Sequence, residues 1–171
     1  MKQLSFLQPC TQVSKPVTVR GSSWKLFVDG ASRKNPGLAG AGMALFKDDE
    51  PIKKRGWYLK LKTNNQAEYL ALLLGLFYSR KLIESQDMLY IMADSELLIK
   101  QMSGIYKVKN DEIKKLHQCA LHLIGDMRHS FCHVRREYNT IADEMANEGI
   151  DKKHLPSQEF IAMLEKYEIS F

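Results

Sequence analysis

Four acidic side chains, Asp29, Glu68, Asp94 and Asp143, stand where predicted strands end or predicted helices begin. A single acid in the first turn of a helix, as expected for Glu68 and Asp143, is also favoured by the helix dipole, by about 0.3–1 kcal/mol. Four acids together are harder to explain in that way. Two negative charges about 4 Å apart repel each other by about 4 kcal/mol at an effective dielectric constant of 20.

Carboxylates that converge must therefore be protonated or neutralised by cations. Oxygen ligands of this kind select a hard ion, Mg²⁺ or Mn²⁺, which keeps coordination positions for water and phosphate oxygens. Two such ions about 3.5–4 Å apart can activate a water and stabilise the leaving oxygen of a phosphodiester. We therefore predict that the four acids hold two Mg²⁺ ions when substrate is bound, with Mn²⁺ as a possible replacement.

The elements that must position these acids can be read from the order of apolar runs and turns. Three strands at about 24–29, 38–46 and 52–62 form an antiparallel meander, and a helix capped by Asn64 or Asn65 runs to Arg80. An apolar strand at 88–93 ends on Asp94 and leads into a short helix, a helix at 111–127 and a strand at 129–135. Asn139 or Thr140 caps the next helix, which reaches Asn147, and an amphipathic helix follows at 157–168.

This order predicts an α/β fold with a five-stranded mixed sheet, three strands antiparallel and then two parallel, flanked by helices. The right-handed crossover through the helix after the meander lays the fourth strand beside the first. The ends of these two neighbouring strands would bring Asp29 and Asp94 to one crevice. Glycines in the second strand indicate that another backbone approaches it closely.

The composition is that of one globular domain, with 44% apolar and 26% charged residues among 171. We expect an N-terminal extension at 1–22, a core domain at 23–150 and a C-terminal extension at 151–171. No apolar run reaches the roughly 20 residues of a membrane span, so no membrane partner is expected. Three cysteines without a framework spacing predict a reducing, cytoplasmic location. The net charge of +5 favours an anionic partner.

Four segments carry a resemblance to a known family. VDGASRKNPG (28–37), TNNQAEYLALLLGL (63–76), ADSELLIKQMSG (93–104) and HVRREYNTIADEMANE (133–148) resemble the four acidic motifs of type 1 ribonuclease H. The similarity is closest to the compact ribonuclease HI-like subfamily of bacteria, archaea and plants, and it spans residues 24–149.

The resemblance implies a ribonuclease H-like fold and endonucleolytic hydrolysis of the RNA strand of RNA–DNA hybrids, leaving 3′-hydroxyl and 5′-phosphate ends. It implies that the four acids are the catalytic metal ligands, with Asp29 as the bridge between two ions. It also implies contacts to the hybrid backbone from four further residues: Gly30, Asn35, Thr63 and Asn64. Side-chain amides and hydroxyls can recognise a 2′-hydroxyl group. Asn35 is equally suited to a turn, and Asn64 to a helix cap.

The chain departs from the larger members of the family. The segment between the last strand and the last long helix leaves no room for their histidine-bearing loop, and His133 on the strand should not take over its role. Arg135 or Arg136 could replace that histidine electrostatically. The basic protrusion is reduced to a short loop with Lys107 and Lys109, and we expect no separate hybrid-binding domain before the core.

Other interpretations remain open at this stage. A non-catalytic nucleic-acid-binding module of the same fold would bind hybrid or double-stranded RNA without needing Asp29. An exonuclease-like relative is disfavoured, because Ala31 stands where a second acid is expected. A zinc site at Cys119, His122, Cys132 and His133 fits no common spacing. Trp57 and Tyr58 could stack on bases or pack in the core, and the 157–168 helix could support either a monomer or a dimer.

Overall fold

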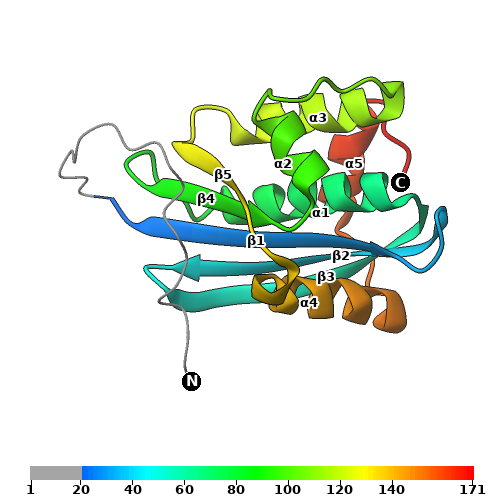
Figure 1. Cartoon of the computed structure of the whole chain (residues 1–171), viewed down its shortest axis with the longest axis horizontal. Coiled ribbons are helices and arrows are strands. Elements are labelled where there is room, and N and C mark those ends of the chain that lie inside the picture. The colour runs from blue at the N-terminus through cyan, green and yellow to red at the C-terminus, as the bar shows by residue number, and fades with distance from the viewer. Residues whose placement is uncertain (1–20) are drawn as a thin grey trace.

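A five-stranded mixed sheet runs through the molecule in the order β3-β2-β1-β4-β5 (Figure 1). The computed structural model describes residues 21–171, so nearly all of the predicted extension at 1–22 lies outside the described residues. The strands are β1 (Ser23–Ser32), β2 (Gly37–Lys47), β3 (Glu50–Lys62), β4 (Met88–Ala93) and β5 (His129–His133). The β1–β2 and β2–β3 pairs are antiparallel, and the β1–β4 and β4–β5 pairs are parallel. The predicted fold class is therefore confirmed.

Residues 21–171 form five α-helices that flank the sheet, and Figure 1 shows α4 on one face with α1, α2, α3 and α5 on the other. They are α1 (Asn64–Ser79), α2 (Glu96–Met102), α3 (Asp111–Ile124), α4 (Thr140–Lys152) and α5 (Gln158–Lys166), with a 3₁₀ turn at Arg136–Tyr138 before α4. Within residues 21–171, no helix combines the length and the apolar character that a membrane crossing requires.

The apolar residues divide between the two faces of the sheet. The larger cluster lies between the sheet, α1 and α3, and it buries almost the whole leucine run of α1 because that helix is covered on two sides. A smaller cluster on the α4 side contains Phe27, Met92, Cys132 and Ala142.

Two glycines set how closely helices approach β1, which carries Asp29, and its neighbour β2. A Cβ atom on Gly30 would lie 2.2 Å from the backbone nitrogen of Glu68, so α1 can pack against β1 there only because Gly30 has no side chain. A Cβ atom on Gly42 would lie 2.0 Å from the carbonyl oxygen of Ala142 in α4. The close approach predicted for the glycines of the second strand is thus explained by α4.

The structure corrects several local expectations. Strand β1 does not end at Asp29 but continues to Ser32 in its pairing with β2. Thr63 caps α1, rather than Asn64 or Asn65, because its side chain accepts from the backbone N–H of Gln66 and the Gln66 side chain accepts from the Thr63 N–H. Leu61 is exposed, since an irregularity at Lys60, whose φ is 63°, interrupts the alternation along β3.

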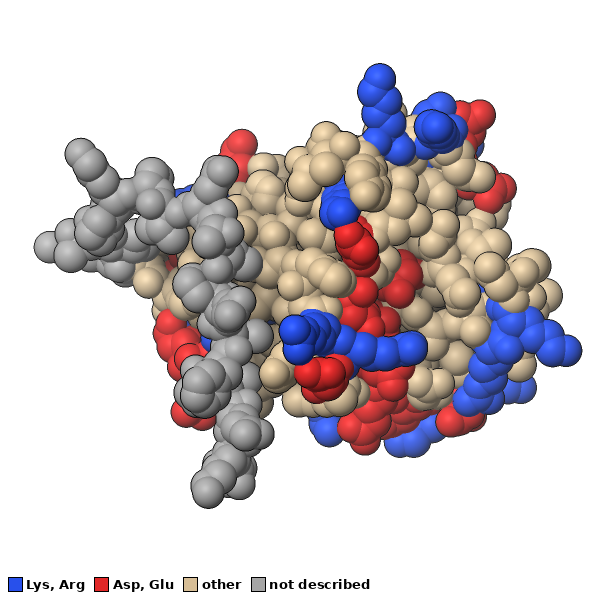
Figure 2. All heavy atoms as spheres, viewed as in Figure 1, with Lys and Arg blue, Asp and Glu red and all other residues tan. Residues whose placement is uncertain are grey.

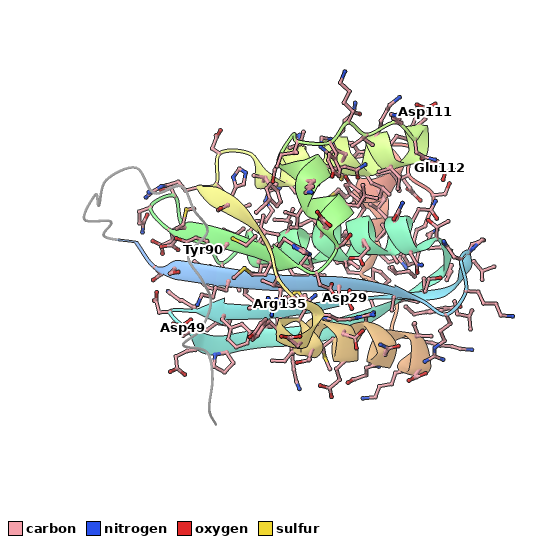
Figure 3. The ribbon with its side chains drawn as sticks, in the orientation of Figure 1. Asp29, Asp49, Tyr90, Asp111, Glu112 and Arg135 are labelled. Carbon is pink, nitrogen blue, oxygen red and sulfur yellow. The ribbon has the colours of Figure 1, made fainter. Side chains whose placement is uncertain are left out.

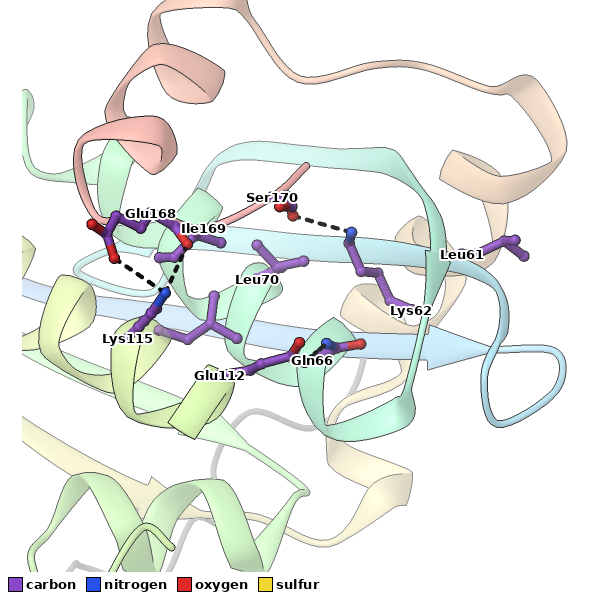
Figure 4. Close-up of a pocket in the computed structure, with 10 residues that line it drawn as sticks. Leu61, Lys62, Gln66, Leu70, Glu112, Lys115, Glu168, Ile169 and Ser170 are labelled. Atoms are coloured by element: carbon purple, nitrogen blue, oxygen red, sulfur yellow. Dashed lines mark hydrogen bonds and ion pairs between the residues drawn. The ribbon is translucent and has the colours of Figure 1, made fainter. Parts of the chain in front are cut away.

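The C-terminal segment packs on its own chain. Phe160 and Leu164 of α5 are fully buried in the larger cluster, so the apolar stripe of that helix is covered in cis. Beyond α5, the ammonium groups of Lys62 and Lys115 donate to the carbonyl oxygens of Ser170 and Glu168 at 3.2 and 3.3 Å (Figure 4). The division into a 23–150 domain with an extension at 151–171 stays a prediction.

Candidate active site

Strands β1 and β4 separate where the acidic residues gather. The last parallel pair joins Phe27 to Met92, after which β4 ends at Ala93 while β1 continues. Asp29 and Asp94 lie just beyond this point, and Figure 3 places Asp29 near the middle of the sheet. In Figure 2, acidic side chains gather across the middle of the same face, with basic side chains crossing the band.

Three of the four predicted acids lie within metal-binding distance of one another. One carboxylate oxygen from each of Asp29, Glu68 and Asp94 lies within 4.8 Å of the others, although the residues come from β1, α1 and the end of β4. Asp143, in the first turn of α4, joins this group through a hydrogen bond between its carboxyl group and that of Asp29. The structure therefore brings all four acids to one place, with Asp29 at the centre.

Burial and mutual repulsion raise the pKa values of two of these acids in the metal-free protein. Burial, followed by the charges of Glu68, Asp94 and Asp143, raises the pKa of Asp29 to about 9. Burial and the charge of Asp94 likewise raise the pKa of Glu68 to about 8, although a hydrogen bond from the backbone N–H of Gly30 and the charge of Arg136 oppose the change. Nearby cations would reverse this effect by favouring the ionised forms.

The donor set fits a divalent cation. The Oε2 atom of Glu68 is buried and has no hydrogen-bond partner, so one acceptor of the cluster is left for a ligand that the protein does not supply. The other atoms that could bind a metal here are also carboxylate oxygens, which suit Mg²⁺ or Mn²⁺. Among residues 21–171, Asp29, Glu68 and Asp94 form the one group of three or more acid, histidine or cysteine side chains with this geometry.

A second polar patch adjoins the start of α1. The Oδ1 atom of Asn35 accepts a hydrogen bond from the backbone N–H of Asn64 at 3.0 Å, and Thr63 lies beside them as the cap of α1. Asn35 and Thr63, with residues at the starts of α1 and α3, line a hollow of about 310 Å³. Its lining consists of Asn35, Thr63, Asn65, Gln66, Asn110, Glu112 and Ile113. The structure thus groups the predicted contact residues Asn35, Thr63 and Asn64, whereas Gly30 lies against α1.

The comparison with known proteins gives one consistent result. The family model described as reverse transcriptase-like matches residues 27–149. Ribonuclease HI of Halobacterium salinarum (strain ATCC 700922 / JCM 11081 / NRC-1) is 35% identical over 134 residues, covering 77% of this chain and 66% of that protein. The crystal structure of ribonuclease H1 from this archaeon superposes with a TM-score of 0.72 at 32% identity, covering 76% of this chain and 98% of that one.

This chain belongs to the type 1 ribonuclease H family.

Two further members extend the comparison. The bifunctional protein Rv2228c of Mycobacterium tuberculosis (strain ATCC 25618 / H37Rv) is 36% identical over 126 residues, which cover 72% of this chain. This chain spans only 34% of that relative's length. LC11-RNase H1, solved in complex with an RNA/DNA hybrid, superposes with a TM-score of 0.69 at 34% identity, covering 75% of this chain and 97% of that one.

The basic residues near the acids, Arg135, Arg136 and His133, make different contacts. The Nε atom of Arg136 lies 3.7 Å from Oδ2 of Asp94, whereas Arg135 faces Glu137 at 3.8 Å. His133 contacts the backbone oxygen of Asp94, not its carboxylate, at 3.2 Å. Of these two arginines, Arg136 is the one paired with an acid of the cluster.

The structure also separates the residues of the zinc interpretation. Cys119 belongs to the large cluster beneath α3, and Cys132 belongs to the smaller cluster on the α4 side. Trp57 is fully buried and stacks on Tyr78 at 5.3 Å, so it packs in the core and is not presented to bases.

Sequence reasoning misjudged one residue of this ribonuclease H site. Asn139 precedes α4 as expected, but its side chain makes no capping hydrogen bond. It reaches Asp94 and β1 instead. The sequence signal, an asparagine four residues before an acid, is the same for a cap and for this contact.

Proposed function

We propose that this chain is an endoribonuclease that hydrolyses the RNA strand of RNA–DNA hybrids. The observation that carries the proposal is the cluster of Asp29, Glu68 and Asp94, with oxygens within 4.8 Å and a buried, unpartnered Glu68 oxygen among them. Such a cluster is electrostatically unfavourable without a cation. The hybrid as substrate is supported by LC11-RNase H1, a 34% identical relative solved with an RNA/DNA hybrid.

In this proposal Asp29, Glu68, Asp94 and Asp143 would hold two Mg²⁺ ions, for which Mn²⁺ could substitute. Bound divalent ions supply Lewis acidity that activates an attacking water and stabilises the leaving oxygen. Cleavage then leaves 3′-hydroxyl and 5′-phosphate ends. Arg136, 3.7 Å from the Asp94 carboxylate, keeps a positive charge beside the site.

The patch of Asn35, Thr63 and Asn64 would hold the hybrid backbone next to the acids. It combines amide and hydroxyl groups that can both donate and accept, which is the chemistry needed to recognise a 2′-hydroxyl group. Gly30 would contribute through its backbone. A role for double-stranded RNA as a second partner and a cytoplasmic location are also parts of the proposal.

The test is a cleavage assay on a hybrid whose RNA strand is labelled, run with Mg²⁺, with Mn²⁺ and with EDTA. We expect cleavage with either metal, no cleavage in EDTA, and loss of cleavage in Asp29→Asn and Asp94→Asn. Asp126→Asn removes an exposed acid in the turn between α3 and β5 and serves as the matched control. Mass spectrometry of the fragments identifies the end groups.

A second result would contradict the enzymatic proposal. If the wild-type protein binds the hybrid but leaves it intact with both metals, and Asp29→Asn binds equally well, the chain is a binding module and the enzymatic proposal is wrong.

A further inference from the structure

The side chain of Asn139 lies where three elements of the site meet. It is 1% exposed, and its Nδ2 atom lies 2.9 Å from the carbonyl oxygen of Val28 and 3.1 Å from Oδ1 of Asp94. Both neighbours are acceptors, so the amide must present its NH₂ group to them, because the reverse orientation would place its oxygen against two oxygens. The orientation of the amide is thus fixed by its surroundings.

Through these bonds Asn139 connects the segments that carry three of the acids. Val28 immediately precedes Asp29 on β1, and Asp94 receives the second bond directly. The carbonyl oxygen of Asn139 also accepts the backbone N–H of Asp143 at 3.1 Å, in the first turn of α4. A shift of this residue would therefore move the acids relative to one another.

The geometry differs from that of a helix cap. A capping asparagine accepts a hydrogen bond from the second or third backbone N–H of the helix through its side-chain oxygen. The Oδ1 atom of Asn139 is buried without a hydrogen-bond partner, and no such bond is formed. The side chain contributes its donors to Asp94 and Val28 while its acceptor stays unsatisfied.

We propose that Asn139 is a positioning residue, whose amide holds the Asp94 carboxylate in the orientation needed to share a cation with Asp29 and Glu68. The inference rests on the proposed metal site and is independent of which nucleic acid is cleaved. Without the Asn139 amide the Asp94 carboxylate would be free to rotate, and Arg136, its ion-pair partner, would draw it away from the cluster. Partners that orient metal ligands typically contribute a factor of roughly 10–100 in metal affinity.

The experiment measures Mn²⁺ affinity of the full chain, stripped of metal, by calorimetry and by the electron paramagnetic resonance signal of free Mn²⁺. We expect Asn139→Ala and Asn139→Ser to bind Mn²⁺ roughly 10- to 100-fold more weakly than wild type. Serine is among the best capping residues, so a purely capping role would be rescued by Asn139→Ser. That variant also carries the test if Asn139→Ala fails to fold.

Asn147→Ala is the matched control. Asn147 lies on the same helix and its amide donates to the backbone oxygen of Asp143 at 3.0 Å, without touching a carboxylate. Its Mn²⁺ affinity should stay within about twofold of wild type. Activity gives a second readout. The Asn139 variants should lose kcat at low Mn²⁺, recover it at high Mn²⁺, and keep the KM for hybrid, because Asn139 is buried away from substrate.

The outcomes separate the two claims. Unchanged Mn²⁺ affinity in Asn139→Ala, or full rescue by Asn139→Ser, would overturn the positioning role and leave the proposed function intact. If the wild-type protein itself binds no Mn²⁺, the proposed metal site fails and the role of Asn139 fails with it.

Discussion

Two buried aspartates near strand β1, Asp87 and Asp29, have the same exposure and opposite electrostatics. Each is 4% exposed. Asp87, beside the start of β1, accepts hydrogen bonds from Ser22 N–H and Trp24 Nε1, both at 2.8 Å, and from Glu84 N–H at 3.0 Å. Burial alone would raise the pKa of Asp87, but these bonds and the charge of Lys47 outweigh burial and hold it below its ordinary value.

Asp29 stands further along the same strand, where β4 has ended. It faces three other acids in place of donors, and its pKa rises to about 9. Surface exposure alone therefore does not decide whether a carboxylate stabilises the fold. Asp29 is more deeply enclosed by protein than Asp87 and lacks the donors that Asp87 has, and a deeply buried acid without donors marks a place suited to an outside cation. The following predictions test this contrast, starting with the largest effect.

Catalytic activity should distinguish the two aspartates most strongly. Asp29→Asn should lower kcat for hybrid cleavage by at least roughly 10³-fold, because the amide cannot replace a carboxylate that holds the ions. Asp87→Asn should leave kcat within about threefold, since Asp87 forms only structural hydrogen bonds. Steady-state cleavage assays below the unfolding temperature of both variants measure this. Comparable losses in the two variants would refute the contrast.

The substitutions Asp87→Asn and Asp29→Asn should change the stability of the metal-free protein in opposite directions. Asp87→Asn should lower the free energy of unfolding by about 1–3 kcal/mol, because three donors then face a group with only one acceptor oxygen in place of two. Asp29→Asn should raise it by about 0.5–2 kcal/mol, because wild-type Asp29 must take up a proton on folding at this pH, whereas the amide does not. Urea unfolding in EDTA at pH 8 measures both. A destabilised Asp29→Asn variant would show that Asp29 contributes to the fold in its own right.

The dependence of stability on pH follows from the two pKa changes. The folded-state pKa values of Asp29 and Glu68, about 9 and 8, exceed the ordinary 3.8 and 4.5. At pH values between the ordinary and the folded-state pKa of each group, the folded, metal-free protein holds more protons than the unfolded chain. Its free energy of unfolding therefore falls as pH rises. The stabilising effect of Asp29→Asn should therefore grow from pH 5 to pH 9.

Asp87 provides the control for this measurement. Because its folded-state pKa is lowered, its contribution is fully present above the ordinary value of 3.8 and is lost only as pH falls through the folded-state value. The effect of Asp87→Asn should thus be constant from pH 5 to pH 9. A pH-independent effect of Asp29→Asn over the same range would mean that Asp29 is ionised without metal.

The smallest effect is expected at the two arginines. Arg136→Ala should lower kcat by roughly three- to tenfold, because its charge lies beside Asp94, and Arg135→Ala should change kcat by less than twofold. Both effects are small because the two side chains are largely exposed to solvent. Single-turnover cleavage at saturating enzyme separates kcat from hybrid binding. Equal losses in both variants would argue against a specific role for Arg136.

Much of this arrangement could be predicted because it depends on local patterns. Apolar runs predicted the five strands that the described residues form, and acids at the ends of two predicted strands and in the first turns of two predicted helices predicted the cluster. The cap at Thr63 was also readable, since Thr63 and Gln66 have the spacing of a capping box, but the neighbouring asparagines are equally good caps by residue type.

Other features depend on contacts between distant segments and leave no local signal. That β1 continues to Ser32 is decided by its partner β2, and the exposure of Leu61 is decided by one backbone irregularity at Lys60. Asn139 reaches a carbonyl group 111 residues away, which no window of sequence reveals. Position in the sheet, not residue type, likewise separates Asp29 from Asp87.

The most direct test is a crystal of the wild-type protein soaked in Mn²⁺ and measured at a wavelength where manganese scatters anomalously. The account predicts an anomalous peak among the carboxylates of Asp29, Glu68 and Asp94, with Glu68 Oε2 among its ligands and no peak at Asp87. An empty cluster in a crystal that holds Mn²⁺ elsewhere, or a peak from which Asp29 turns away, would contradict it.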